Sequence, residues 1–272
     1  MTDHDSQGVS LDSGIDITVA HPARRYDYLL GGKDNFAADR ESGDALDAVF
    51  PHIRAAARSN RDFLRRAVTF LTVEAGIRQF LDIGTGLPSA NNTHQVAQAL
   101  APEARIAYVD NDPLVLVHAR ALLTSTPEGA TSYTEADLRD PPAILAHPEV
   151  TGVVDFTRPV ALLLVSVLAF LKDADDPWGA VATLMDPLPT GSYLVLSHGA
   201  TDHFDPEVLA SWYRAAPDSR LRSSAEITPF FAGLEVVPPG LVSTADWRPD
   251  DDPAQRLTPE QAVTVAGVAR KP

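Results

Sequence analysis

The chain has 272 residues, of which 44% are hydrophobic and 22% are charged. These proportions are typical of globular proteins and exclude a wholly disordered chain. The formal net charge is −15. Because nucleic-acid binding depends on cationic side chains that neutralise phosphates, this charge argues against a nucleic acid as partner. Cysteine is absent, which excludes disulfides, thiolate metal sites and a cysteine nucleophile.

Residues 1–20 are polar and aperiodic, and we expect them to form a flexible tail. They lack the basic start and the apolar stretch of a secretory signal. The longest apolar run, from Val160 to Leu171, is too short to cross a bilayer. The sequence therefore predicts a cytoplasmic protein that does not associate with a membrane.

Residues 36–75 have the pattern of a helix, because apolar side chains recur at steps of three and four residues from Ile53 to Ala75. Pro51 suits a first helical turn, and Gly76 suits the position just past a helix end. We interpret five arginines in this segment as a solvated helix face rather than as a phosphate-binding surface. They are Arg54, Arg58, Arg61, Arg65 and Arg66. We expect residues 21–76 to form an N-terminal helical extension.

From residue 77 onward, short apolar runs alternate with helical stretches. The predicted strands are 79–83, 105–109, 132–135, 160–166, 191–198, 235–243 and 263–269. The predicted helices are 93–100, 113–123, 141–147, 177–185, 206–215 and 224–231. This alternation predicts a mostly parallel, doubly wound sheet. The last two strands are joined by an acidic loop, 247–259, without an obvious helix, so we expect an antiparallel pair at the edge.

The first predicted strand ends in a glycine turn. It runs into Asp82, which is followed by two glycines one residue apart, Gly84 and Gly86. In an open α/β sheet, ligands bind outside the carboxyl ends of the strands, where the first strand-to-helix turn lies. Glycines let the backbone approach such a ligand closely. Taken alone, the same pattern also fits an ordinary tight turn.

Two more carboxylates follow predicted strands. Asp110 ends the second strand, where a carboxylate can accept hydrogen bonds from two ribose hydroxyls. Asp137 follows the third strand, where its carboxylate or an adjacent backbone group can meet an adenine amino group. Ordinary structural roles are open as well, since Asp112 can cap the next helix and Asp137 can be a turn residue. Together, the three strand-end carboxylates favour a nucleoside ligand.

The position of Asp82 separates two nucleoside cofactors. A dinucleotide places a pyrophosphate over the glycine turn, whereas S-adenosylmethionine carries an ammonium, a sulfonium and no phosphate. At about 4 to 6 Å, a carboxylate favours a cation and opposes an anion. Ser89 also stands where the dinucleotide fingerprint requires Gly or Ala. The sequence favours S-adenosylmethionine, with a nicotinamide-dependent oxidoreductase and a non-catalytic S-adenosylmethionine-binding protein as alternatives.

Several motifs carry a family resemblance. Leu81-Asp-Ile-Gly-Thr-Gly86 and Val109-Asp-Asn-Asp-Pro113 resemble motifs of class I methyltransferases. From about His21 to Pro272 the chain is more closely similar to an actinobacterial S-adenosyl methyltransferase family long catalogued as a domain of unknown function. The motifs specific to this family are Arg25-Tyr-Asp-Tyr-Leu-Leu-Gly-Gly-Lys-Asp-Asn35, Phe50-Pro-His-Ile-Arg54, Arg158-Pro-Val-Ala-Leu-Leu-Leu164 and Pro239-Gly-Leu-Val242.

The resemblance implies a Rossmann-like class I methyltransferase fold. Its sheet has seven mostly parallel strands with an antiparallel last strand, and residues 77–272 form the S-adenosylmethionine-binding core in one structural unit with the extension. The implied reaction is methyl transfer to an acceptor that we expect to be a small molecule. The expected cofactor contacts are Asp82, Gly84, Thr85, Gly86, Asp110, Asn111, Asp137, Leu138 and Ser166. The spacing of His, Asp and Glu indicates no catalytic metal.

The segment 24–36 is the predicted lid. Gly31 and Gly32 suit the end of a short helix, and the residues from Lys33 to Asn35 are expected to close over the methionine end of the cofactor. The alternative is an ordinary helix that packs across the sheet edge.

For an acceptor that must lose a proton, the candidate bases are His198 and His203, with Asp202 as an orienting partner. A buried structural histidine is the alternative at each position. Relatives in the family have a histidine in the run 168–171, where this chain has Ala169, so that position lacks a catalytic role here. The sequence leaves the catalytic residue unassigned.

Overall fold

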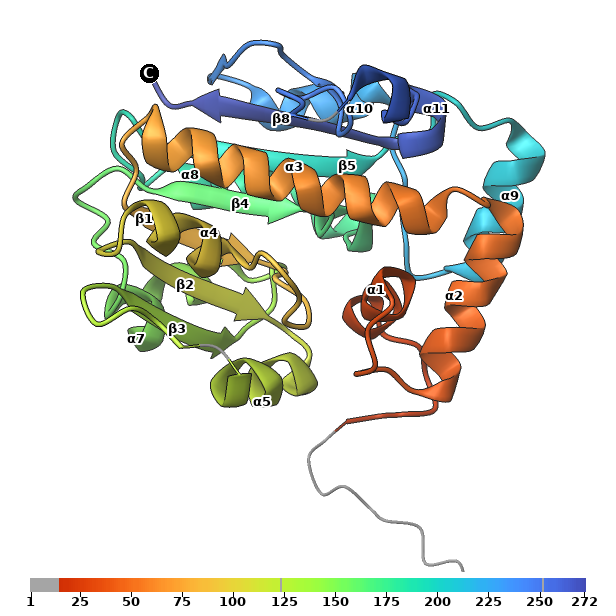
Figure 1. The fold of residues 1–272 in the computed structure, drawn as a ribbon, viewed down its shortest axis with the longest axis horizontal. Coiled ribbons are helices and arrows are strands. Elements are labelled where there is room, and N and C mark those ends of the chain that lie inside the picture. The colour runs from red at the N-terminus through yellow and green to blue at the C-terminus, as the bar shows by residue number, and fades with distance from the viewer. Residues whose placement is uncertain (1–14, 123, 251) are drawn as a thin grey trace, which may run out of the picture.

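The computed structural model describes residues 15–122, 124–250 and 252–272, and its centre is a single sheet (Figure 1). The strands are β1 (Gln79–Ile83), β2 (Arg105–Asp110), β3 (Ala130–Glu135), β4 (Ala161–Val165), β5 (Tyr193–Gly199), β6 (Glu235–Val236), β7 (Val242–Ser243) and β8 (Thr264–Arg270). They lie in the order β3-β2-β1-β4-β5-β8-β6, and β7 also pairs with β8. The sheet reverses its order at β1, between β2 and β4.

The strand directions confirm the predicted fold class. The first five strands are parallel, and β8 is antiparallel to β5, β6 and β7. The single strand predicted over 235–243 is wrong, because β6 and β7 are separated by a segment containing Pro238 and Pro239. Proline has no amide hydrogen to donate to a ladder. The sheet therefore has eight strands where seven were predicted.

Helices cover the sheet and its carboxyl edge. They are α1 (Pro22–Leu30), α2 (Ala37–Val49), α3 (Ile53–Val73), α4 (Thr93–Leu100), α5 (Pro113–Leu122), α6 (Pro141–Ala146), α7 (Pro148–Thr151), α8 (Pro177–Met185), α9 (Pro206–Ala215), α10 (Ser224–Ile227) and α11 (Pro259–Ala262). The helix predicted over 36–75 is two helices. The break follows from Pro51, which disfavours a helical conformation at Phe50, where φ is −137°. The loop predicted over 247–259 contains a 3₁₀ turn, Pro253–Gln255, and leads into α11.

Two apolar layers enclose the sheet. On the face that α3 crosses in Figure 1, Phe63 and Leu71 pack with Phe80 and Trp247. On the opposite face, α8 packs against the central strands, as the cluster containing Leu184 shows. β4 is aliphatic, with Leu162 and Leu164 in one layer and Leu163 in the other, so it is covered on both faces.

The arginines of α3 only partly form the solvated face that we expected. Arg66 is buried and donates to the backbone oxygens of Thr244 and Trp247, at 2.6 and 2.9 Å. Arg61 lines the cavity described below. Arg58 is exposed, as predicted. The helical period placed these side chains beside the apolar stripe, and tertiary packing then covered some of them.

A third apolar cluster joins α1, α2 and α9 at the carboxyl ends of the parallel strands (Figure 1). Leu46 and Phe50 pack there with Trp212 and Val263. This cluster places α1 over the strand ends. Residues 1–14 of the predicted tail lie outside the described residues, so the flexible tail stays a prediction.

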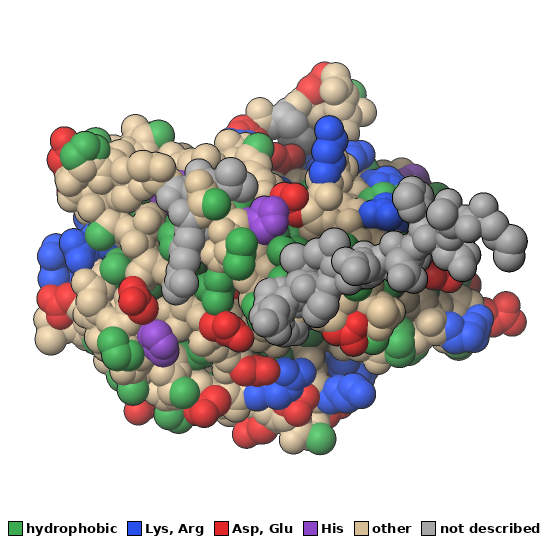
Figure 2. Space-filling view, turned by 90° about the horizontal axis from the view of Figure 1, so that it is seen from below, with side chains coloured by type: hydrophobic (Ala, Val, Ile, Leu, Met, Phe, Trp, Pro, Cys, Tyr) green, Lys and Arg blue, Asp and Glu red, His purple; other side chains and the backbone are tan. Residues whose placement is uncertain are grey.

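The surface carries no single large apolar patch on the face that Figure 2 shows. There, hydrophobic side chains lie singly or in small groups among charged ones. The large hydrophobic side chains that are exposed belong to several separate segments of the described chain: Ile17, Val19, Val73, Leu100, Val117 and Val236. Within the described ranges, every helix is too short or too polar to cross a membrane.

Candidate functional site

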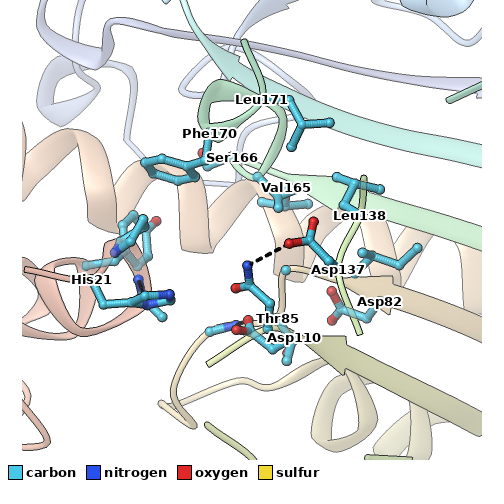
Figure 3. A pocket seen from close by; sticks show the side chains of 18 of the residues that line it. His21, Asp82, Thr85, Asp110, Asp137, Leu138, Val165, Ser166, Phe170 and Leu171 are labelled. Carbon is cyan, nitrogen blue, oxygen red and sulfur yellow. Dashed lines mark hydrogen bonds between the residues drawn. The ribbon is translucent and has the colours of Figure 1, made fainter. Parts of the chain in front are cut away.

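A cavity of about 320 Å³ lies at the carboxyl ends of β1, β2, β3 and β4 (Figure 3). Its floor is the turn after β1, its sides follow the other three strands, and α1 with part of α3 lines the remaining side. All nine residues predicted to contact the cofactor line it: Asp82, Gly84, Thr85, Gly86, Asp110, Asn111, Asp137, Leu138 and Ser166. The sheet order reverses here, which is where open α/β sheets bind their ligands.

Asp82 lies near the end of β1 and is 5% exposed. The Thr93 hydroxyl donates to its Oδ2 at 2.6 Å. Burial raises the pKa of Asp82 to about 6, although the Thr93 hydrogen bond and the charge of Arg61 oppose the rise. A buried carboxylate with a neutral donor gains strongly from a cationic partner. The floor of the cavity is therefore suited to a positively charged group.

The two glycines of the turn differ in the space that is available for a side chain. Both have positive φ, +71° at Gly84 and +68° at Gly86. A Cβ at Gly84 would lie 2.2 Å from Val167 Cγ2, so a side chain is excluded there, whereas nothing lies within 4 Å of a Cβ at Gly86. The amide of Gly86 instead donates to Asp110 Oδ2 at 2.8 Å. This bond ties the turn to the end of β2.

Asp110 is 6% exposed, and burial raises its pKa. Its two oxygens accept one backbone amide each, from Gly86 and from Asp112, the latter at 3.0 Å. A carboxylate oxygen can accept more than one hydrogen bond. The fixed orientation leaves acceptor capacity for vicinal hydroxyls in the cavity.

Asp137 and Ser166 line the cavity at the ends of β3 and β4. The Asp137 carboxylate accepts from Arg139 at 2.9 Å and from Asn111 at 3.4 Å, the contact dashed in Figure 3. It is thus already partly engaged, and Leu138 supplies an apolar wall beside it. Ser166 has φ +59°, which is uncommon for a residue with a Cβ and is typical of functional sites.

Sequence reasoning missed Arg61, which reaches the cavity from α3. Its guanidinium donates to the backbone oxygens of Ala90 and Asn91, at 3.1 and 3.2 Å. Its Nε is buried and has no hydrogen-bond partner among the described residues. Because a buried donor without an acceptor is costly, an anionic ligand group fits this position.

The helix α1 is fastened over the cavity by polar contacts. Arg25 donates two hydrogen bonds to the Asp218 carboxylate, at 3.1 and 2.9 Å. The Tyr26 hydroxyl donates to Ala57 O at 2.9 Å and accepts from Asn60 at 3.0 Å. These bonds join α1 both to α3 and to the segment after α9.

Gly31 ends α1 with φ +86°, as the sequence predicted. None of the residues from Lys33 to Asn35 lines the cavity, so their closure over the cofactor stays a prediction. Asp34 and Asn35 donate instead to the Asp27 carboxylate, at 3.0 and 2.8 Å, which draws the loop back onto the helix. The first turn of α1 faces the cavity, through His21, Pro22, Ala23 and Tyr26.

The candidate bases at the end of β5 are also wrong. His198 is fully buried beside Arg222, with its Nε2 3.0 Å from the guanidinium, and burial lowers its pKa to about 4. His203 lies 3.7 Å from Glu260, and Asp202 accepts from Ser224. None of these side chains lines the cavity. His21, which does line it, was missed.

This fold and this site define a class I methyltransferase. The chain belongs to the S-adenosyl methyltransferase family, whose sequence profile matches residues 9–272. Its cofactor is accordingly S-adenosylmethionine, and the protein is an S-adenosylmethionine-dependent methyltransferase rather than a nicotinamide-dependent oxidoreductase.

Solved structures support the assignment. A DUF574 family protein from Streptomyces avermitilis MA-4680 is 48% identical, with a TM-score of 0.90 over 94% of this chain and 99% of that one. A candidate methyltransferase from Thermobifida fusca YX is 42% identical, with a TM-score of 0.86 over 97% and 99%. Magnesium protoporphyrin IX methyltransferase from Synechocystis PCC 6803, with bound S-adenosylhomocysteine, is 13% identical over 91% and 93% (TM-score 0.53) and shows the fold alone. The comparison with curated proteins found no match.

Proposed function

We propose that the protein transfers the methyl group of S-adenosylmethionine to a small molecule that binds beneath α1. The position of α1 is the observation that carries this proposal, since its first turn lines the cavity and narrows the access of an acceptor to the strand ends. The net charge of −15 supports a small molecule over a nucleic acid as acceptor.

The charges of the cavity support one orientation of the cofactor. Asp82 is suited to the ammonium group, the free Nε of Arg61 to the carboxylate, and Asp110 to the two ribose hydroxyls. Leu138 and Asp137 then lie on the adenine side. The bound cofactor supplies an electrophilic methyl group, and the chain contributes alignment and the exclusion of water.

Replacing Asp110 with asparagine is expected to weaken binding of S-adenosylhomocysteine by roughly 10- to 100-fold, because hydrogen bonds to a charged group contribute about 1.5–3 kcal/mol. Asparagine keeps one acceptor oxygen for the backbone amides. Binding of 5′-methylthioadenosine, which has the same ribose but no amino-acid part, should weaken equally. Calorimetric titration measures both affinities, and unchanged values would remove the ribose assignment.

Replacing Arg61 with glutamine should weaken S-adenosylhomocysteine about tenfold or more, because a charge-assisted hydrogen bond to the carboxylate is lost. The affinity for 5′-methylthioadenosine, which lacks that carboxylate, should not change. Arg58→Gln is the matched control, since Arg58 is an exposed arginine of the same helix and lies outside the cavity. Equal weakening of the two ligands would contradict the assignment.

A further inference from the structure

A second cavity, of about 270 Å³, lies at the amino ends of the parallel strands. It is lined by residues that precede or begin β1, β4 and β5, and by the end of β8, which runs in the opposite direction. In Figure 1 this is the end of the sheet opposite α1, where β8 ends. Among the described residues, none lines both this cavity and the cofactor cavity. The second cavity is therefore separate from the methyltransferase site.

The wall of this cavity is cationic, although the protein is strongly acidic. Arg78, Arg158 and Arg270 line it, whereas none of the described residues in its wall is Asp or Glu. Over the whole chain, 37 Asp and Glu residues outnumber 22 Lys and Arg residues. Three arginines around one cavity are thus contrary to the composition, and their like charges repel one another. A bound anion relieves this repulsion.

Arg158 is the arginine with the most donors available to a ligand. Its side chain is exposed and makes no hydrogen bond or ion pair within the described part of the chain. Hydrogen bonds from Thr157, and to a smaller extent the charge of Arg158, lower the pKa of Asp155. Gln79 holds the backbone before Arg158, because its side-chain amide donates to Asp155 O at 3.0 Å and accepts from the Asp155 amide at 2.7 Å. The backbone is fixed while the guanidinium remains open to a ligand.

Arg78 and Arg270 are engaged only in part. Arg78 Nε donates to Glu103 at 2.6 Å, and its Nη1 donates to two backbone oxygens. Arg270 Nη1 donates to Glu235 at 3.2 Å. Over residues 15–122, 124–250 and 252–272, Arg78 Nη2 and the Nε and Nη2 of Arg270 make no hydrogen bond. Each of these two guanidinium groups therefore has donors left for an anion.

Tyr193 and two glycines belong to the same wall. Tyr193 lies opposite Arg270 in the pairing of β5 with β8, and its ring packs edge-on against Phe70. Gly76 and Gly191 have no side chain that could fill the space, and a Cβ at Gly76 would contact nothing within 4 Å. The cavity is thus open between the arginines.

These donors favour a phosphate group over other anions. A guanidinium binds a phosphate through two parallel hydrogen bonds. A phosphate group carries about −1.5 to −2 charges at neutral pH and three strong acceptor oxygens, which is one for each arginine. A carboxylate has only two oxygens. A long polyanion such as a nucleic acid is disfavoured, because the net charge of −15 repels it.

We propose that this second cavity binds a phosphate group, held by Arg158 together with Arg78 and Arg270. The phosphate comes either from free inorganic phosphate or from a small phosphorylated molecule. Bound there, it joins the segments before β1 and β4 to the end of β8. The site does not depend on the identity of the methyl acceptor.

Calorimetric titration of the full chain tests this site, with the cofactor cavity saturated with S-adenosylhomocysteine. The probes are inorganic phosphate and ribose 5-phosphate at constant ionic strength. We expect a dissociation constant of about 1 mM or lower, the level that a few charge-assisted hydrogen bonds provide. Arg158→Gln should weaken binding about tenfold or more, and Arg158→Glu should abolish it. Arg58→Gln is the matched control, because Arg58 is exposed and lies outside both cavities.

The two probes distinguish the sources of the phosphate. Tighter binding of ribose 5-phosphate supports a phosphorylated small molecule, and equal or tighter binding of inorganic phosphate supports free phosphate. Failure of both probes to bind, or equal affinities in wild type and Arg158→Gln, overturns the proposal. So does phosphate binding that Arg61→Gln abolishes, because Arg61 belongs to the cofactor cavity. If S-adenosylhomocysteine does not bind, the proposed function fails, and titration of the unliganded chain still tests the phosphate site.

Discussion

Asparagine in place of Asp82 is expected to weaken S-adenosylhomocysteine by about 30-fold or more, since losing one partner of a buried charge pair costs about 2–5 kcal/mol. The substitution keeps an oxygen that can accept from Thr93, so the local structure is preserved. Affinity for 5′-methylthioadenosine should stay almost constant, because that ligand has no ammonium group. Calorimetry with both ligands is the measurement, and a parallel loss for both would refute the ammonium assignment.

The same residue should make binding depend on pH. In the free protein burial raises the pKa of Asp82 to about 6 from 3.8. A cation binds the ionised form, so affinity should be constant well above pH 6 and should fall as the pH drops through 6. The Asp82→Asn variant lacks this titration, and a wild-type affinity that stays flat across pH 6 would contradict the role of Asp82.

The free energy of unfolding of the cofactor-free protein should rise as the pH falls, whereas the affinity for the cofactor should fall. Because the folded pKa of Asp82 lies above the unfolded value, folding favours the protonated carboxyl, and this group destabilises the fold above about pH 6. The penalty is relieved as the pH falls from about 6 toward 3.8. Asparagine should relieve it at neutral pH as well, which raises the free energy of unfolding by about 1–3 kcal/mol. Residues that bind a ligand often lower the stability of the ligand-free protein, which is a known trade-off between stability and function.

Alanine at Gly84 is expected to lower the free energy of unfolding by roughly 2 to 6 kcal/mol. The positive φ contributes about 1–3 kcal/mol of strain, and the overlap with Val167 adds about 1–3 kcal/mol. Cofactor binding should weaken as well, because the turn forms the floor of the cavity. Chemical denaturation of the purified protein measures the change.

Gly86→Ala is the matched control for that substitution. Its φ is nearly the same, but a Cβ there would contact nothing within 4 Å, so only the backbone strain of about 1–3 kcal/mol applies. The difference between the two variants isolates the contact with Val167. Equal losses would show that backbone strain alone accounts for both.

The cofactor side of the site could be predicted from the sequence because its determinants are local. Asp82, Asp110 and Asp137 each follow an apolar run that ends in a turn, and parallel strands bring their carboxyl ends to one edge of the sheet. A strand and the turn after it are encoded within about ten residues. Their convergence then follows from the topology.

The side of the cavity formed by α1 and α3 could not be predicted in this way. Arg61 lies on α3 and His21 directly precedes α1, and the direction of both side chains depends on how α1 and α3 pack against distant segments. His198 was placed in the site because it ends a strand, but its side chain lies between Arg222 and Phe230 instead. The available signal for His21 was its place directly before Pro22, at the start of the helix predicted to cover the site.

The apolar cluster that seats α1 and α2 also bears on how the chain folds. Leu46 and Phe50 pack against Trp212, and Val263 completes the same cluster. These partners are far apart in sequence, so closing the contact costs loop entropy that only the nearly finished domain can offset. The packing of α1 and α2 is therefore completed only after the segment around Val263 has been synthesised. Hydrogen exchange should then be faster in α1 and α2 than in the central strands, which marks the entrance to the cavity as the region that opens first.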